Sequence, residues 1–203
     1  RMPEQLLAYA KQLYTLHIGS CAPAPAWFLT QEMTERFPGL NVDITVEHSD
    51  KLVEGFLDGR YQLVITKEAI SGDGVQSSLQ AREQLSIFLP RSHPLADREG
   101  LCFSDLKGES VLCFQNLGDW EDVLRPTMQQ IHFIYQTDRQ SFIQLLQASH
   151  LPSIASNLAS KTAPEVKRVN VPLLDEGTQM DLYLSVHEKD RYLLDGDNPT
   201  KRK

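Results

Sequence analysis

Cysteine is the most reactive side chain in this sequence, and it occurs three times, at Cys21, Cys102 and Cys113. Because the number is odd and the residues lie far apart, a reducing compartment suits them better than a disulfide framework. Cys113 lies in an apolar segment and Cys102 lies beside Phe103, surroundings that raise a thiol pKa and make the thiol unreactive. Cys21 falls between a predicted strand and a predicted helix, whose N-terminal dipole could favour a thiolate. Two interpretations of Cys21 stay open, a redox sensor and an unreactive thiol, and we favour the second.

Histidines and known catalytic motifs give no sign of an enzyme centre. None of the histidines is paired at i, i+4 or lies near a cysteine pair, which favours surface or hydrogen-bonded histidines over a metal site. They are His17, His48, His93, His132, His150 and His187. A Gly-x-Ser-x-Gly turn, a phosphate-binding glycine loop and a paired-glycine dinucleotide fingerprint are all missing from the sequence. We therefore expect no metal, no cofactor, and neither phosphoryl nor hydride transfer.

Length, composition and charge limit the class of protein further. The chain has 203 residues, of which 41% are hydrophobic and 23% charged, as in an ordinary globular protein with a packed core. No apolar run approaches the roughly 18 residues of a membrane span, and residues 1–4 lack a signal-peptide run. We therefore expect a cytoplasmic protein without membrane contact. The net charge of −7 argues against nucleic-acid binding by these residues, because that requires clustered lysine and arginine.

Strand and helix patterns alternate along the first part of the chain. The expected elements are a helix at 3–13, a strand at 15–20, a helix at 24–37, a strand at 41–47, a helix at 50–58 and a strand at 63–65. Apolar side chains alternate with polar ones in the first two strands, whereas the third is a continuous apolar run. Pro25 suits the first turn of a helix, and Gly59 suits a C-terminal stop. This order predicts a parallel sheet with crossover helices.

The second part of the chain repeats the alternation. The expected elements are a long strand at 76–89, a strand at 111–114, a helix at 119–129, a strand at 131–136, a helix at 138–149, and strands at 166–171 and 180–186. Pro126 is expected to kink the helix or to end it early. Trp27 and Trp120 fall in predicted helices, where packing in a core or interface is favoured over stacking on a ligand. Two α/β lobes are the predicted organisation.

Several short segments follow one another in an order that is typical of one protein family. They cover residues 16–19 (Leu-His-Ile-Gly), 37–42 (Phe-Pro-Gly-Leu-Asn-Val), 57–66, 85–96 and 106–108 (Leu-Lys-Gly). Each is common alone, but the run from His93 to Ala96 at this distance after a Gly-Arg-x-x-Leu-x-Ile strand is specific. Over residues 16–188 the chain resembles the effector-binding domain of LysR-type transcriptional regulators.

The resemblance implies an α/β fold like that of the type 2 periplasmic binding proteins. Two lobes, each a mixed sheet with flanking helices, would be joined by two crossing strands. Lobe I would comprise residues 15–90 plus 187–203 and lobe II residues 91–186, with residues 1–14 as the end of a linker helix. The hinge would contain Pro90, Arg91, Ser92, His93, Val186 and His187.

A small effector in the cleft between the lobes is also implied by the resemblance. Ligands of open α/β sheets bind beyond the carboxyl ends of the strands, where helix N-termini present amide hydrogens. The residues at these ends are Ser20, Cys21, Ala22, Thr66, Lys67, Phe114, Gln115, Asn116, Thr137 and Asp138. Amide nests favour an anionic or carboxylate-bearing metabolite, with the hydroxyls of Ser20, Thr66 and Thr137 as donors. For Thr66 and Thr137, a hydroxyl bonded to its own backbone is nearly as good an interpretation.

Three departures from the family pattern accompany the resemblance. The segment 19–38 is shorter than in the family, and Ala22 and Pro23 stand where a serine or threonine often contacts the effector. Residues 149–151 (Ser-His-Leu) replace a Gly-x-Gly near the cleft rim, and the closing helix of lobe I is reduced to 191–194. These departures suggest unusual effector chemistry or a weak response to small ligands.

The function implied by the resemblance is effector sensing within a bacterial transcription factor. DNA would be bound only by an N-terminal winged helix-turn-helix that precedes these residues, and the effector would bias the arrangement of lobes or subunits. A homodimer or tetramer would pair through the helices at 24–37 and 139–149. A stand-alone solute-binding protein is one alternative, which the missing signal sequence disfavours. An enzyme on the same scaffold is another, and it would need an acid/base pair that the sequence does not show.

Overall fold

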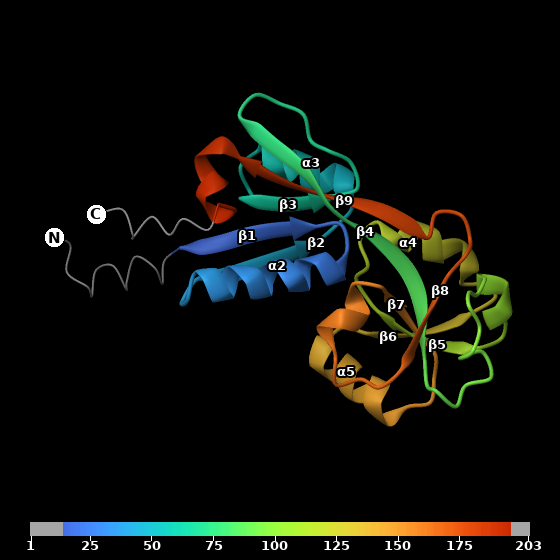
Figure 1. Ribbon diagram of the computed structural model, residues 1–203. Helices are drawn as coiled ribbons and strands as arrows, with labels where there is room; N and C mark the ends of the chain where they lie inside the picture. Colours follow the sequence, from blue (N-terminus) through green and yellow to red (C-terminus); the bar gives the residue numbers. More distant parts are fainter. Residues whose placement is uncertain (1–13, 196–203) are drawn as a thin grey trace.

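Two α/β lobes joined by a pair of long strands make up the computed structural model, which describes residues 14–195 (Figure 1). In this range, nine strands form one continuous sheet in the order β2-β1-β3-β9-β4-β7-β5-β6, and β8 also pairs with β4. The predicted helix at 3–13, nearly all of the predicted linker end at 1–14 and the tail 196–203 lie outside the described residues. None of the helices in residues 14–195 has the length and apolar character needed to cross a membrane.

The first lobe contains three parallel strands with a helix on each face, and the antiparallel strand β9 extends their sheet next to β3. Its elements are β1 (Thr15–Ser20), α2 (Pro23–Arg36), β2 (Asn41–Val46), α3 (Ser49–Leu57) and β3 (Leu63–Thr66). β1 pairs in parallel with both β2 and β3. Leu29 and Met33 of α2 pack in the cluster that contains Leu63, whereas Phe56 of α3 packs on Val64. Because side chains alternate along a strand, the two helices cover opposite faces, and all three strands end at the edge that faces the second lobe (Figure 1).

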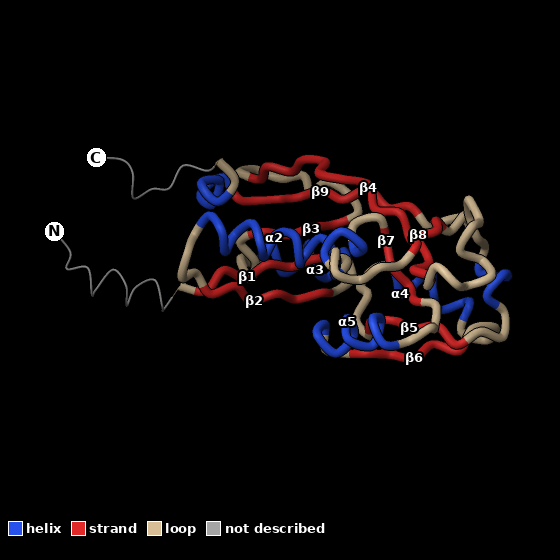
Figure 2. The backbone as a smooth tube through the Cα atoms, turned by 60° about the horizontal axis from the view of Figure 1, so that its bottom comes forward, coloured by secondary structure: helices blue, strands red, loops and turns tan. Residues whose placement is uncertain are grey.

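The strands β4 (Val75–Leu89) and β9 (Gln179–His187) connect the lobes (Figures 1 and 2). Residues 75–84 of β4 pair antiparallel with β9, whereas residues 85–89 pair with β7 and β8 of the second lobe. β4 therefore changes partners between Gln84 and Leu85. The amide Nε2 of Gln84 donates to the carbonyls of Leu85 and Leu173, both at 2.9 Å, so this side chain fixes the backbone at the crossing.

The second lobe surrounds the far part of β4 with shorter elements. These are η1 (Phe103–Leu106), β5 (Ser110–Phe114), α4 (Trp120–Leu124), η2 (Arg125–Thr127), β6 (His132–Gln136), α5 (Arg139–Ala148), β7 (Ser153–Ser156), η3 (Ala159–Thr162) and β8 (Val169–Pro172), and η4 (Glu188–Leu193) follows β9. Val111 of β5 packs in one cluster with Trp120 of α4. The next residue, Leu112, packs in another cluster with Phe142 and Leu146 of α5. As in the first lobe, helices cover both faces of the sheet.

Most predicted elements are confirmed, and two differences have clear physical reasons. The predicted helix at 119–129 ends at Leu124 and continues only as the 3-10 turn η2. Pro126 accounts for this early end, because proline has no N–H to donate and clashes with the preceding turn. The strand β7 was not predicted, because it is only four residues long and is defined by partners distant in sequence, on β4 and β5.

The predicted lobe boundaries and hinge residues can be located in the structure, but their hinge function stays a prediction. Residues 90–93 form a turn after β4, in which the N–H of His93 donates to the carbonyl of Pro90 at 2.9 Å. Val186 and His187 end β9 in the first lobe, where the His187 ring stacks on Phe56. Both groups lie away from the Gln84–Leu85 crossing, and residues 85–89 belong to the sheet of the second lobe rather than of the first.

Candidate functional site

The lobes touch directly at the carboxyl ends of β1 and β2. Residues 115–119, which follow β5 in the second lobe, lie against these strand ends. The backbone N–H of Asp119 donates to the carbonyl of Cys21 at 2.8 Å, and Asn116 Nδ2 donates to the carbonyl of Val46 at 3.0 Å. Gly118 allows the approach, because its φ is 59° and a Cβ there would lie 2.1 Å from the Cys21 carbonyl oxygen. The carboxyl ends of β1 and β2, where a ligand was expected, are thus in contact with residues 115–119 of the second lobe.

The carboxylate of Asp119 reaches across this contact to the first turn of α3. Asp119 is 5% exposed. One carboxylate oxygen accepts the backbone N–H of Ser49 at 3.1 Å, and the other accepts the Ser49 hydroxyl. The backbone N–H of Lys67 donates to the same hydroxyl oxygen at 3.1 Å and so orients it. Since a helix N-terminus favours negative charge, the Asp119 carboxylate lies in a favourable electrostatic position at the start of α3.

His48 brings a titratable group to the rim of the same contact. Its ring lies 3.2 Å from Glu47 and 3.7 Å from the carboxylate of Asp122 in the second lobe. Burial alone would lower the pKa of His48, but the hydrogen bond with Glu47 and the charges of Asp122 and Asp119 together raise it. Protonated His48 therefore adds a favourable charge interaction between the lobes.

Most of the predicted polar site residues at this edge are bonded within the chain. The hydroxyl of Ser20 donates to the carbonyl of Ala22 at 2.6 Å. The hydroxyl of Thr66 donates to the carbonyl of Glu68 at 2.7 Å, which is the local backbone bond given above as its alternative interpretation. The side chain of Lys67 is exposed. Only its backbone takes part in the contact between the lobes, through the N–H that donates to the Ser49 hydroxyl.

The structure favours the unreactive interpretation of Cys21. Its side chain is fully buried. Burial raises the pKa of the thiol to about 12, and the charges of Asp119 and Glu83 act in the same direction. Burial therefore disfavours a thiolate at Cys21, in spite of the nearby N-terminus of α2. Cys113 is also buried. Burial raises the pKa of its thiol, in the predicted direction, to about 12.

The remaining predicted residues divide between the surface and a cavity. Gln115, Thr137 and Asp138 are exposed. Asp138 caps α5, where its carboxylate accepts the N–H of Ser141 at 2.7 Å and its pKa is lowered by that bond. Phe114 is different, because its ring lines a cavity between the lobes. Of the predicted site residues, Phe114 lines this cavity, while the polar ones lie elsewhere.

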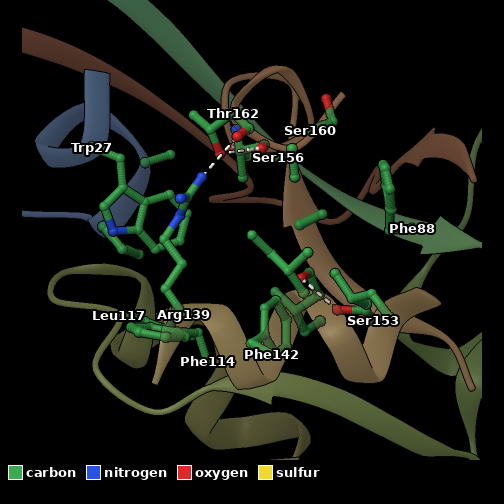
Figure 3. Close-up of a pocket in the computed structure, with 18 of the residues that line it drawn as sticks. Trp27, Phe88, Phe114, Leu117, Arg139, Phe142, Ser153, Ser156, Ser160 and Thr162 are labelled. Atoms are coloured by element: carbon green, nitrogen blue, oxygen red, sulfur yellow. Dashed lines mark hydrogen bonds between the residues drawn. The ribbon is translucent and has the colours of Figure 1, made fainter. Parts of the chain in front are cut away.

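The cavity is largely apolar and lies where α2 of the first lobe approaches α5 and β7 of the second (Figure 3). Its cavity volume is about 70 Å³. The ring of Phe114 meets Trp27 edge to face at 5.6 Å and Phe142 at 5.9 Å between ring centroids. Such a lining suits the apolar body of a small organic ligand.

Arg139, the first residue of α5, places a cation in this apolar lining (Figure 3). Its guanidinium carbon lies 4.7 Å from the centre of the Trp27 ring, and Nη2 donates to the carbonyl of Thr162 at 2.7 Å. Its Nε is buried and has no hydrogen-bond partner among the described residues. Because an unsatisfied buried donor is costly, a hydrogen-bond acceptor that reached the Nε–H of Arg139 would stabilise it.

Glu83 of β4 forms part of the same lining at the crossing strand. It is 2% exposed, and its carboxyl accepts Nε1–H of Trp120 at 3.0 Å and the hydroxyl of Ser156 at 2.6 Å. Burial raises the pKa of Glu83, although the bonds from Ser156 and Trp120 partly oppose the shift. This carboxyl ties the crossing strand to α4 and β7, and it becomes easier to protonate when the protein folds.

Glu83 gives a testable pH dependence. Because its folded pKa is raised, its contribution to stability is fully present below its unfolded pKa of about 4.5 and is lost as pH rises through the folded pKa. We expect Glu83→Gln, which cannot ionise, to gain stability relative to the original protein as pH rises above 4.5. Urea unfolding of both proteins across this pH range measures the effect. A pH-independent difference between them would contradict the assignment.

Sequence reasoning missed most of the cavity. Trp27 was assigned to packing, and Arg139, Ser156 and Glu83 were not singled out. A usable signal existed for Glu83, which is a charged residue inside the long strand predicted at 76–89. For Arg139 the sequence shows only a helix beginning after Asp138, and the cavity that it faces exists only when α2 lies opposite. Among residues 14–195, no group of three or more potential metal ligands is found.

Two lobes on crossing strands, with a cavity between them, define a periplasmic-binding-protein-like ligand-binding fold. The regulatory domain of NMB2055 (MetR), a LysR family regulator from N. meningitidis, superposes with a TM-score of 0.61 at 20% identity, covering 87% of this chain and 85% of that one. The BenM effector binding domain with its effector benzoate gives 0.54 at 18% identity, covering 86% and 84%. Full-length BenM gives 0.58 at 17%, covering 94% and 71%. The predicted fold class is confirmed.

The sequence itself matches the family model of the LysR substrate binding domain over residues 14–193. This chain therefore belongs to the LysR substrate-binding domain family, as its sequence segments predicted. A curated relative, the HTH-type transcriptional regulator TtuA of Agrobacterium vitis, is 30% identical over 109 residues, which are 50% of this chain and 35% of TtuA. The chain thus aligns with about a third of that relative's length. TtuA is a transcriptional regulator, and NMB2055 (MetR) is a LysR family regulator.

Proposed function

We propose that this domain senses a small, mostly apolar anion in the cavity between α2 and α5 and thereby regulates DNA binding by a LysR-type protein. The observation that carries the proposal is the buried Nε–H of Arg139, which has no partner among the described residues and belongs to a largely apolar lining that also contains Glu83. A carboxylate would satisfy this donor with a charge-assisted bond. The aromatic rings of Trp27, Phe114 and Phe142 would hold the apolar part of the same ligand.

In the proposed regulator, DNA contact belongs to an N-terminal helix-turn-helix that is not part of these residues. The net charge of −7 supports this division of roles, because a DNA-binding surface is rich in lysine and arginine. The protein would act in the cytoplasm as a homodimer or tetramer. Phe28 of α2 is 38% exposed and supports a subunit contact through this helix. A ligand between the lobes would shift their arrangement by its difference in affinity for the two arrangements.

Benzoate, the effector in one related structure, is a suitable first probe of the cavity, with benzamide as its neutral counterpart. We expect the domain to prefer aromatic or aliphatic carboxylates over the matching amides. We expect Arg139→Gln to lower carboxylate affinity by roughly 10-fold to 100-fold, since a hydrogen bond to a charged group contributes about 1.5–3 kcal/mol. Quenching of Trp27 fluorescence or calorimetry of a carboxylate panel measures both effects.

Arg60→Gln is the matched control for this prediction. Arg60 is an exposed arginine of the first lobe that pairs with Asp58 at 3.7 Å and does not line the cavity. Its replacement removes one positive charge and should leave carboxylate affinity unchanged. If Arg139→Gln binds the preferred carboxylate as tightly as the original protein does, the proposed site is wrong.

A further inference from the structure

We propose that Asp119 is a built-in carboxylate ligand, which fills an anion site at the start of α3 and holds the lobes closed without any external anion. The carboxylate comes from the second lobe, and its partners come from the first. This inference does not depend on ligand binding in the cavity beside Arg139. It concerns the other interlobe contact, at the carboxyl ends of the parallel strands.

The partners of Asp119 recognise it as a site recognises a bound carboxylate. Both of its oxygens are used, one by the backbone N–H of Ser49 at 3.1 Å and one by the Ser49 hydroxyl. The N–H of Lys67 at 3.1 Å from that hydroxyl oxygen leaves the hydroxyl hydrogen directed at Asp119. Ser49 is also nearly buried, at 7% exposed, so water competes little for these bonds. Charge-assisted bonds of this kind are the strong ones.

The surrounding backbone makes the contact a latch between the lobes rather than a surface ion pair. The N–H of Asp119 also donates to the carbonyl of Cys21 at 2.8 Å, so one residue makes both a backbone and a side-chain bond to the first lobe. Gly118 lies so close to Cys21 that a side chain at this position would not fit. Opening the lobes would break all these bonds together. The equilibrium between closed and open lobes therefore depends strongly on the Asp119 side chain.

The latch determines which surfaces of the closed domain a ligand can reach. An external carboxylate can occupy the start of α3 only when Asp119 has left it, so the closed domain offers the cavity beside Arg139 and not the strand ends. Removing the Asp119 carboxylate should create a binding site for a free one. A small carboxylate such as acetate or formate is then the direct probe, because it supplies the missing group without an apolar body.

The experiment compares Asp119→Ala with the original protein by small-angle X-ray scattering and by thermal unfolding, in chloride and in acetate at equal ionic strength. We expect the variant to have a larger radius of gyration and a lower melting temperature in chloride. Acetate should restore both in a saturable manner, and it should have little effect on the original protein. Asp50→Ala is the matched control, because Asp50 is an exposed acid in the first turn of the same helix without a bond to the second lobe.

Two more variants keep the test decisive. Asp119→Asn retains the size of the side chain and should open the lobes less than Asp119→Ala, which covers the case that the alanine variant does not fold. The double variant Asp119→Ala, Arg139→Gln should keep the acetate response, because that response arises at α3 and not in the cavity. The latch is refuted if both Asp119→Ala and Asp119→Asn stay as compact as Asp50→Ala. It is also refuted if acetate stabilises Asp119→Ala no more than it stabilises that control. It is also refuted if the double variant loses the response.

Discussion

Replacing Trp120 with alanine is expected to lower the free energy of unfolding by about 3–5 kcal/mol, the range for truncating a buried aromatic side chain. Trp120 is 2% exposed and lies in the main cluster of the second lobe. Its Nε1–H is also one of two donors to Glu83, so its loss leaves a buried carboxyl short of a partner. Urea unfolding followed by circular dichroism measures the change, and the melting temperature should fall by on the order of 10 °C.

The variant Trp120→Phe separates the contribution of apolar packing from that of the hydrogen bond to Glu83. Phenylalanine keeps most of the apolar packing but has no N–H, so it should cost about 1–3 kcal/mol, the penalty for leaving a buried polar group unsatisfied. Trp27→Ala is a second comparison, because Trp27 is only partly buried at the cavity and should contribute less to stability. A loss below about 1 kcal/mol for Trp120→Ala would contradict the packing described for α4.

Gly118→Ala should destabilise the protein and separate the lobes. Alanine at a φ of 59° costs about 1–2 kcal/mol from backbone sterics alone. A Cβ at this position would also lie 2.1 Å from the Cys21 carbonyl oxygen, a distance that neither backbone can accept without moving. The loop must therefore retreat from β1, and the bonds of Asp119 to Cys21 and Ser49 should be lost with it. Unfolding measurements and the radius of gyration report the two effects.

Gly74→Ala provides the matched control for this substitution. Gly74 has a φ of 68°, and a Cβ there would have nothing within 4 Å. It therefore carries the backbone strain without the clash. The additional loss of stability in Gly118→Ala, and any lobe separation, measure the contact with Cys21. Equal effects in the two variants would show that the close approach of the lobes does not exist in solution.

The order and type of the elements were largely predictable because local patterns specify them. Alternating side chains in 15–20 and 41–47 and the apolar run before Thr66 predicted the strands of the first lobe, and Pro126 predicted where α4 would end. The strand β7 was not predicted, because a four-residue strand shows too little periodicity. Its pairing with Leu85 and Leu112 is visible only in the folded chain.

The candidate site was far less predictable than the fold. The rule that ligands lie beyond the carboxyl ends of parallel strands led to Ser20 and Thr66, whose hydroxyls the chain uses for its own carbonyls. The same rule could not show that the Asp119 carboxylate would accept a hydrogen bond from the backbone N–H of Ser49, because these residues are 70 positions apart. Arg139 was passed over since a helix N-terminal arginine has no distinguishing pattern until Trp27 is placed beside it.

The cysteines, Asp119 and Arg139 show which properties follow from the sequence and which depend on the tertiary structure. The sequence by itself determined the family, the two-lobed α/β architecture and the apolar surroundings of Cys113, because these depend on local periodicity and on segments with a fixed order. Only the tertiary structure decided that Cys21 is a buried thiol with a raised pKa, that Asp119 fills the anion site at α3, and that Arg139 faces a cavity. Each of these depends on how closely one lobe approaches the other, which is set by packing between residues far apart in the chain.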